Sequence, residues 1–289
     1  MRPRDFVIFI LICLVWGFSN VLSKIVIDHW SVPPLFFAAL RFSLVALVTL
    51  PWLLPMPRPH LRVAAIGLLL GAGNFALLFL GLQSASPSAV AIVIQIGVPF
   101  TTLLSIFILG ERIRWRRGLG IALTLLGVLI VLWSPQGIEL SAGLWFVIGA
   151  ALAGSLGAVL MKRTENVAPL RFQAWVGLVS FLPLACASAF WEQGQWAAAA
   201  EAGWRFAAAL LFSAIVVSVV AHSAYFWMIS RYEANLVAPL TLLTPLSTIG
   251  FGVLLTGDDI NLRMVAGAVL AFIGVLIVAL RTRKPEPLP

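Results

Sequence analysis

The sequence predicts an all-α membrane protein with ten transmembrane helices in two inverted repeats of five helices. Three observations support this prediction. The composition is 61% hydrophobic and 10% charged, and the mean hydropathy is +1.05, so lipid must surround most of the chain. The apolar residues fall into runs of about 20, the length that crosses a bilayer. The second half of the chain also repeats features of the first.

Apolar runs bounded by charged residues, Pro and Gly place the spans in order along the chain. The predicted ranges are 6–27, 34–54, 63–82, 87–109, 115–133, 141–161, 169–190, 205–229, 235–255 and 263–281. The first run is longer than the apolar part of a secretory signal and lacks a clear small-residue cleavage site, so we expect it to remain as a span.

The connecting segments alternate in charge. One side collects most basic residues, namely Arg2, Arg4, Arg58, Arg62, Arg112, Arg114, Arg116, Arg117, Lys162, Arg163, Arg231, Arg281, Arg283 and Lys284. The other side carries Asp28, Glu139, Glu192, Glu201, Asp258 and Asp259, with Arg205 and Arg263 as the main basic exceptions. Because cytoplasmic loops are rich in Lys and Arg, both termini are predicted to be cytoplasmic. An even number of spans also requires both termini to lie on one side of the membrane. The net charge of +8 is therefore interpreted as an orientation signal and not as evidence for a nucleic-acid partner.

The two halves share a pattern near their ends. Pro99 and Pro245 each lie inside an apolar run, and each is followed by a short turn and a helix that contains Gly-Val-Leu-Ile-Val, at 127–131 and 274–278. A weaker echo joins Val-Leu-Ser-Lys at 21–24 with Val-Leu-Met-Lys at 159–162. The repeats are predicted at 1–134 and 135–289. Because each holds an odd number of spans, the second enters the membrane from the opposite face, an arrangement typical of secondary transporters.

Glycines repeat at intervals of seven in the last span of each half, as Gly120 with Gly127 and Gly267 with Gly274. Residues seven apart lie on one helix face, and small residues let helices pack closely. We expect these two helices to pack against each other; the alternative is a seam between two copies of the chain.

With these motifs the chain resembles the drug/metabolite transporter superfamily, in particular its ten-helix EamA-type members. The resemblance covers essentially the whole length, and it rests on Trp16-Gly17, Ser86-Pro87-Ser88-Ala89, Pro99 and Gly110-Glu111-Arg112. The second half has Asp258-Asp259 where an acidic-basic pair is expected, a departure from the family pattern. The resemblance implies export of small metabolites, often amino acids, and similarity to bacterial exporters of aromatic amino acids.

Polar side chains inside hydrocarbon are costly, so we expect them to face the bundle interior or a wet cavity. The residues predicted to bind substrate are Trp16, Asn20, Asn74, Gln95, Pro99, Ser155, His222, Tyr225, Thr244 and Pro245. Spacings of three or four place Trp16 with Asn20, and His222 with Tyr225, on single helix stripes. Each proline removes a backbone hydrogen bond and is expected to kink its helix. The alternative for each polar residue is a hydrogen bond between helices without a ligand, worth about 0.6 kcal/mol.

Two basic residues lie within or near the spans. Lys24 is expected near the outer end of the first span, where it can extend to the interface. Arg41 is about seven residues into the second span, roughly 10 Å deep. It is expected either to extend outward or to pair with carbonyl groups or a carboxylate such as Asp28. The functional alternative is attraction of an anionic group, for example a substrate carboxylate.

No Asp or Glu lies well inside a predicted span, although proton relays in transporters commonly use them. His222 is the one group at mid-depth that titrates near neutrality. We therefore expect a facilitator that runs down the substrate gradient. No Gly-x-x-x-x-Gly-Lys-Ser/Thr pattern for binding ATP is present.

These observations predict a secondary transporter that works by alternating access. The resemblance implies that it exports small metabolites, amino acids in particular, across the bacterial inner membrane. The alternatives are a proton-coupled antiporter of drugs or metabolites that uses His222, and a channel-like facilitator. We expect no enzymatic activity, cofactor or metal. The expected partners are a small-molecule substrate and the lipid bilayer, and the expected state is a monomer or a weak homodimer.

Overall fold

The computed structural model describes residues 2–110, 115–134, 137–138, 142–162, 168–232, 237 and 240–280. Several residues that the sequence singles out lie outside the described residues. They are Glu111, Arg112, Arg114, Glu139, Arg163, Arg281, Arg283 and Lys284.

The described chain is helical apart from a short antiparallel ribbon, β1 (Trp133–Ser134) with β2 (Gly137–Ile138). The helices before this ribbon are α1 (Pro3–Lys24), η1 (Ile25–His29), α2 (Pro34–Val48), η2 (Leu50–Trp52), α3 (His60–Leu68), η3 (Leu69–Gly73), α4 (Asn74–Ser84), α5 (Pro87–Val93), η4 (Ile94–Ile96), α6 (Gly97–Leu109) and α7 (Trp115–Leu132). Those after it are α8 (Ala142–Met161), α9 (Pro169–Trp191), α10 (Gln195–Leu211), η5 (Phe212–Ala221), α11 (His222–Arg231), α13 (Leu243–Phe251), η6 (Gly252–Thr256) and α14 (Leu262–Ala279). The elements η2 and η4 are 3₁₀-helices, and η1, η3, η5 and η6 are π-helices.

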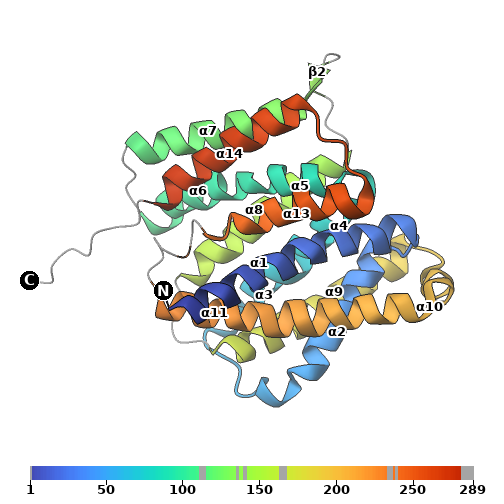
Figure 1. Ribbon diagram of the computed structural model, residues 1–289. Helices are drawn as coiled ribbons and strands as arrows, with labels where there is room; N and C mark the ends of the chain where they lie inside the picture. Colours follow the sequence, from blue (N-terminus) through green and yellow to red (C-terminus); the bar gives the residue numbers. More distant parts are fainter. Residues whose placement is uncertain are drawn as a thin grey trace, which may run out of the picture.

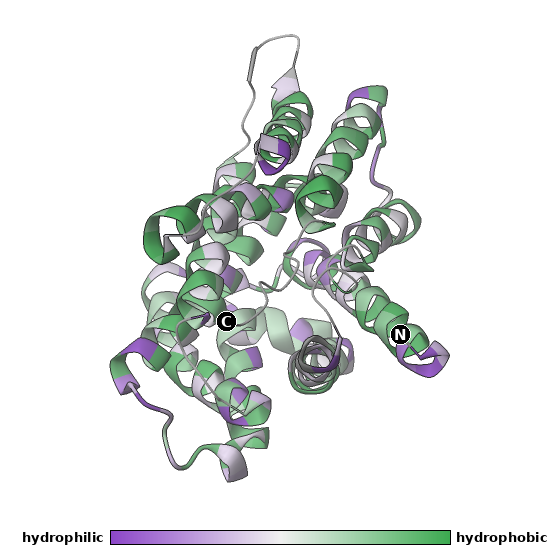
Figure 2. Ribbon diagram, turned by 90° about the vertical axis from the view of Figure 1, so that its left-hand side faces the viewer, coloured by the Kyte–Doolittle hydropathy of each residue, from purple (hydrophilic) through white to green (hydrophobic). Residues whose placement is uncertain are grey.

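By length and composition, eight helical segments of the described chain can cross a membrane, and Pro34–Val48 and Leu243–Thr256 are shorter apolar helices. The prediction of an all-helical membrane protein is therefore confirmed. The helices lie side by side, and α1 begins at the same end of the bundle at which α14 ends (Figure 1). Hydrophobic residues dominate along the helices, whereas hydrophilic residues gather mainly near helix ends (Figure 2).

Most predicted boundaries lie within a few residues of the observed ones, and two differ by more. The predicted start of the ninth span, at 235, lies outside the described residues. The second span is shorter than 34–54 because α2 ends at Val48, just before Pro51, which has no backbone N–H to continue a helix. The eighth segment begins at Gln195 instead of residue 205. Its first part is rich in alanine, the strongest helix former, and this propensity outweighs the charges of Glu201 and Arg205. The helix changes direction at Gly203, where φ is 58° and ψ is −135°.

The glycine faces of α7 and α14 pack against each other, as expected. A methyl group added at Gly120 would lie 2.7 Å from the carbonyl oxygen of Gly274, and one added at Gly127 would lie 2.5 Å from that of Gly267. Both distances are too short for carbon, so the two backbones approach more closely than side chains would permit. In Figure 1 the two helices run together along one edge of the bundle.

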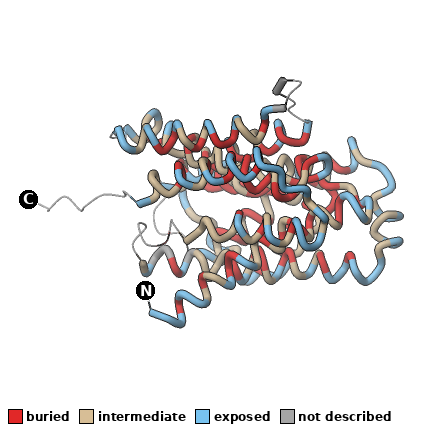
Figure 3. Tube along the Cα trace, turned by 45° about the horizontal axis from the view of Figure 1, so that its top comes forward, coloured by how far each residue is buried: buried red, intermediate tan, exposed pale blue. Residues whose placement is uncertain are grey.

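The interior is filled by apolar side chains, and Figure 3 shows buried positions recurring along the inner helices while exposed positions gather at the ends. Phenylalanines form a continuous group between α2 and α4. Phe37 stacks on Phe79 with ring centroids 5.3 Å apart, and Phe42 meets Phe75 edge to face at 5.4 Å. This aromatic group lies beside Arg41, which is the one buried arginine among the described residues.

Two carboxylates of the second half bind the N-terminal turns of first-half helices. Glu192 accepts hydrogen bonds from the backbone N–H groups of Leu35 (2.7 Å) and Phe36 (2.8 Å) at the start of α2. Asp258 accepts from the N–H of Ser88 (2.8 Å) at the start of α5. The first turn of a helix has N–H groups without internal partners, and a negative charge there is favoured by the helix dipole.

Replacing Glu192 by alanine should leave two N–H groups of α2 without these acceptors. The expected cost is about 1–2 kcal/mol, seen as a fall of a few degrees in the unfolding midpoint of the purified protein. Glu201→Ala, which removes an exposed carboxylate from α10, is the matched control. Equal midpoints for the two variants would contradict this role of Glu192.

Candidate functional site

Three predicted residues form one aromatic cluster where α1 meets α11. The Trp16 ring lies 5.0 Å from the His222 ring and 5.1 Å from the Tyr225 ring, measured between centroids. Trp16 comes from the middle of α1, and the other two come from the first turn of α11, three residues apart on one face. The buried indole Nε1–H of Trp16 has no hydrogen-bond partner. The cluster, called here the Trp16 cluster, therefore has aromatic surface and an unused donor.

The position of His222 depends on an irregular helix. The ten-residue π-helix η5 ends at Ala221, directly before His222. The Nδ1 atom of His222 lies 2.7 Å from the carbonyl oxygen of Val217, five residues earlier. Because a carbonyl can only accept, Nδ1 carries the hydrogen and the other ring nitrogen is left as the acceptor of a neutral ring. π-Helical turns often occur at functional sites.

Asn20 continues the same face of α1 and joins it to α13. Its Nδ2 donates to Thr248 Oγ1 at 3.2 Å, and Thr248 in turn donates to the carbonyl of Thr244 at 3.1 Å. Gly17 allows this close approach, because a methyl group there would lie 2.6 Å from the Cβ of Ser247.

The two prolines occupy equivalent places in interrupted helices. Pro99 is the third residue of α6 and follows the 3₁₀-helix η4, which contains the half-buried Gln95. Pro245 is the third residue of α13 and follows a tight turn in which Thr244 N–H donates to the carbonyl of Thr241 at 3.0 Å. The residue before each resumed helix has ψ near −17°, as in 3₁₀ geometry. Each predicted kink is thus a local change of helix type beside a buried proline.

Asn74 and Ser155 are engaged by neighbouring helices. Asn74 Nδ2 donates to the carbonyl of Ala150 on α8 at 2.7 Å, and Ser155 Oγ donates to the carbonyl of Gly97 on α6 at 2.8 Å. These bonds are of the interhelical kind that the sequence left open as the alternative to ligand binding. They lie on the contacts of α8 and not in the Trp16 cluster.

Arg41 is buried in the bundle, 1% exposed, so the expectation that it extends outward is wrong. Its guanidinium carbon lies 4.4 Å from the ring centroid of Phe75 on α4, and its Nε donates to Ser218 Oγ on η5 at 3.0 Å. The suggested pairing with Asp28 is also wrong, because Asp28 pairs with Lys24. Among the described residues no ion pair of Arg41 occurs, and its Nη2 has no hydrogen-bond partner.

The arrangement around Arg41 leaves its charge only partly stabilised. A desolvated cation–π contact contributes about 2 kcal/mol, and a hydrogen bond from a charged group contributes about 1.5–3 kcal/mol. Burial of a charge without a counter-ion costs several kcal/mol after relaxation. Among the described residues Nη2 has no acceptor, and an anionic group at this atom would supply one.

Three residues in this region, Ser218, Gln173 and Phe75, were not selected from the sequence. Ser218 lies between Arg41 and Gln173, since its carbonyl accepts from Gln173 Nε2 at 2.6 Å. Gln173 is a buried amide in an apolar span, the same signal that selected Asn74. Phe75 gave no signal, because it is one of 19 phenylalanines.

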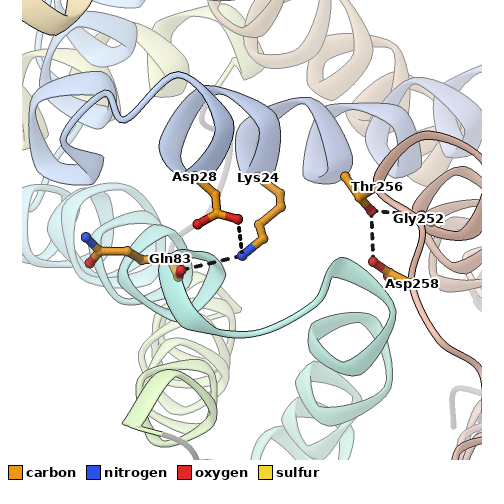
Figure 4. A network of polar contacts seen from close by, with 6 residues as sticks. All are labelled: Lys24, Asp28, Gln83, Gly252, Thr256 and Asp258. Atoms are coloured by element: carbon orange, nitrogen blue, oxygen red, sulfur yellow. Dashed lines mark hydrogen bonds and ion pairs between the residues drawn. The ribbon is translucent and has the colours of Figure 1, made fainter.

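The outer end of α1 carries a second polar group. Lys24 Nζ lies 3.1 Å from Asp28 Oδ2 and 3.4 Å from the carbonyl oxygen of Gln83 on α4, and Figure 4 shows this group beside the contacts of Asp258. A cavity of about 480 Å³ opens at this end and is lined in part by Asp28, Gln83 and Glu192. None of the ten predicted site residues lines it.

Comparisons with known proteins find similar sequences and a similar fold. The model of the EamA-like transporter family matches residues 5–133 and 141–280. A protein of Salmonella typhimurium named "Probable amino-acid metabolite efflux pump" is 29% identical over 96% of this chain and 95% of its own length. An Escherichia coli protein of the same name is 28% identical over 98% of both chains. One crystal structure shares the fold with a TM-score of 0.65 and 19% identity, over 97% of this chain and 98% of that one.

Proposed function

The chain belongs to the EamA-like transporter family, and on that premise we propose that it exports small metabolites, amino acids in particular, across the bacterial inner membrane. It is a multi-pass membrane transporter and not an enzyme. In this proposal ten spans form two inverted five-helix halves, both termini are cytoplasmic, and alternating access carries the solute down its gradient. The observation that carries the proposal is the Trp16 cluster, an aromatic surface with an unused donor inside the bundle.

The contacts between helices support the inverted repeat. The helix α1 packs against α13 and the η5–α11 segment, and its counterpart α8 packs against α6 and the η3–α4 segment. The helix α2 packs on its counterpart α9, and α7 on its counterpart α14. Exchange of the two halves therefore leaves each of these neighbour relations unchanged, as a two-fold relation between repeats requires.

The interrupted helices support alternating access. Secondary transporters commonly bind solute near the bilayer midplane, where discontinuous helices of the two repeats meet. The chain has such interruptions at Pro99 and Pro245, in equivalent positions. A carrier of this kind should show saturable flux that is stimulated by substrate on the opposite side, whereas a channel should not.

The direct test is uptake by purified protein in liposomes, with a panel of the twenty amino acids and related metabolites. We expect ATP-independent flux of a subset of amino acids, with stimulation by the same amino acid loaded on the opposite side. Absence of flux across the panel would rule out the proposal, and flux without stimulation would favour a channel.

His222→Gln tests whether transport is coupled to protons. Gln keeps a polar group that can donate to the Val217 carbonyl but does not titrate. Loss of the ring contact with Trp16 should lower downhill flux by no more than about tenfold. Since we propose a facilitator, downhill flux should persist, and a pH gradient should not drive accumulation in either protein. If wild type accumulates substrate in response to a pH gradient and the variant does not, the antiporter alternative is correct.

A further inference from the structure

We propose that Arg41 binds the carboxylate of the transported solute, and that the neighbouring Trp16 cluster contacts the apolar part of the same molecule. The inference rests on the proposed transport function and adds a substrate class to it. The substrates would be solutes that combine one carboxylate with an apolar group, such as amino acids with apolar side chains.

The first step is the position of the guanidinium. It is held between α4, through the Phe75 ring at 4.4 Å, and η5, through Ser218 Oγ at 3.0 Å. The helix α1 packs against both α4 and η5. Arg41 therefore joins α2 to α4 and η5, the two segments that also contact α1.

The second step is the unused bonding capacity of this region. Arg41 Nη2 and Trp16 Nε1 are both buried and have no hydrogen-bond partner. Both atoms are donors and cannot accept. A ligand that satisfies them must supply acceptors, and a carboxylate supplies two oxygens that match the guanidinium geometry. A solute without an anionic group would leave the cation without a counter-ion.

The third step is the separation between Arg41 and the Trp16 cluster. Ser218 contacts Arg41, and His222, four residues later on the same continuous helical segment, contacts the Trp16 ring. Ser218 and His222 are thus about one helical turn apart on this segment, roughly 6 Å between their backbone positions. We infer that one solute of amino-acid size is long enough to reach both Arg41 and the Trp16 cluster.

The Nε side of the Arg41 guanidinium is held in place by a short chain of hydrogen bonds. Ser218 Oγ accepts from Arg41 and donates to the carbonyl of Ser213 at 3.1 Å, while Gln173 binds the carbonyl of Ser218 at 2.6 Å. Only the Nε edge of the guanidinium is held in this way. The Nη2 end remains for the ligand.

The test compares an amino acid with its amide, which keeps the ammonium and the side chain but lacks the carboxylate. Leucine and leucinamide are used, or the same pair for whichever amino acid the liposome panel carries fastest. Arg41→Met removes the charge at similar length. We expect it to raise the KM for the amino acid at least tenfold and to leave the KM for the amide within twofold of wild type. Arg205→Met, at an exposed position on α10, is the control and should change neither value.

A second variant keeps the test decisive if Arg41→Met does not fold. Ser218→Ala retains the charge but removes the acceptor at Nε, so it should raise the KM for the amino acid about threefold with little effect on the amide. Equal losses for acid and amide in these variants, or no loss in either, would overturn the assignment while leaving transport itself established. A panel without any transported solute would instead overturn the proposed function together with it.

The alternative occupant of this position is an inorganic anion. Measurements of thermal stability distinguish an inorganic anion from the carboxylate of the solute. Wild type in gluconate medium should be stabilised by the amino acid and much less by its amide. If chloride alone stabilises wild type, Arg41→Met abolishes that effect, and the amino acid adds nothing, the site holds a structural anion and the proposal is wrong.

Discussion

Gly127→Val is expected to abolish recovery of folded protein from the membrane. Even one methyl group at Gly127 would lie 2.5 Å from the carbonyl oxygen of Gly267 and 2.9 Å from the Cα of Ala271. Those atoms are backbone, so they cannot move aside as a side chain can, and valine adds two further carbons. Overpacking of this kind costs about 1–3 kcal/mol or more, and separation of α7 from α14 would also lose contacts along both helices. The measurement is the monodisperse fraction in size-exclusion chromatography of detergent extracts.

Gly118→Val is the matched control for this substitution. Gly118 lies on the same helix, and no atom lies within 4 Å of the position that its Cβ would take. The control variant should therefore behave as wild type. If both variants fold normally, the close packing of α7 and α14 is not required for the folded state.

Trp16→Leu should have the largest effect on transport among variants that still fold. Leucine keeps an apolar group on α1 but loses the ring contacts to His222 and Tyr225 as well as the indole N–H. A solute that packs on the indole would lose an aromatic contact worth about 0.5–1.5 kcal/mol and a hydrogen bond from Nε1 worth about 0.5–1.5 kcal/mol. The combined loss of about 1–3 kcal/mol corresponds to a fall of roughly fivefold to 150-fold in kcat/KM for the amino acid that the panel identifies.

Trp145→Leu provides the comparison, because Trp145 on α8 is 58% exposed on the surface of the bundle. This variant should retain wild-type flux. Trp16→Phe, which keeps a ring but removes the N–H, should lie between leucine and wild type. Full activity of Trp16→Leu would show that the Trp16 cluster is only packing.

Much of the helical structure could be predicted from apolar runs and their punctuation. The range 87–109 was predicted to the residue, because Pro87 begins the segment and Gly110 ends it with a positive φ of 70°. Apart from those beside Pro99 and Pro245, the interruptions within segments could not be predicted. The π-helix η5 consists of ordinary apolar residues, and nothing in their order distinguishes a five-residue hydrogen-bond spacing from a four-residue one. The count of ten spans and the inverted repeat remain predictions.

The candidate site was predictable where spacing along one helix decides the geometry. Asn20 lies one turn from Trp16, and His222 lies on the same face as Tyr225. Contacts between segments that are distant in the sequence could not be predicted in this way. That Trp16 meets His222, or that Arg41 meets Phe75 and Ser218, depends on how α1, α2, α4 and η5 cross. A polar residue in an apolar run shows that a partner is needed but not which one.

The close packing of α7 and α14 also sets the order in which the protein can be completed during synthesis. Arg263, at the start of α14, donates a hydrogen bond to the carbonyl of Trp133, just after α7, and the two residues are 130 positions apart. At about 5–20 residues per second, the ribosome needs roughly 6–26 seconds to cover that distance. During this interval the glycine face of α7 is in the membrane without α14 packed against it. The first half therefore reaches its finished packing only when the last helix has been made.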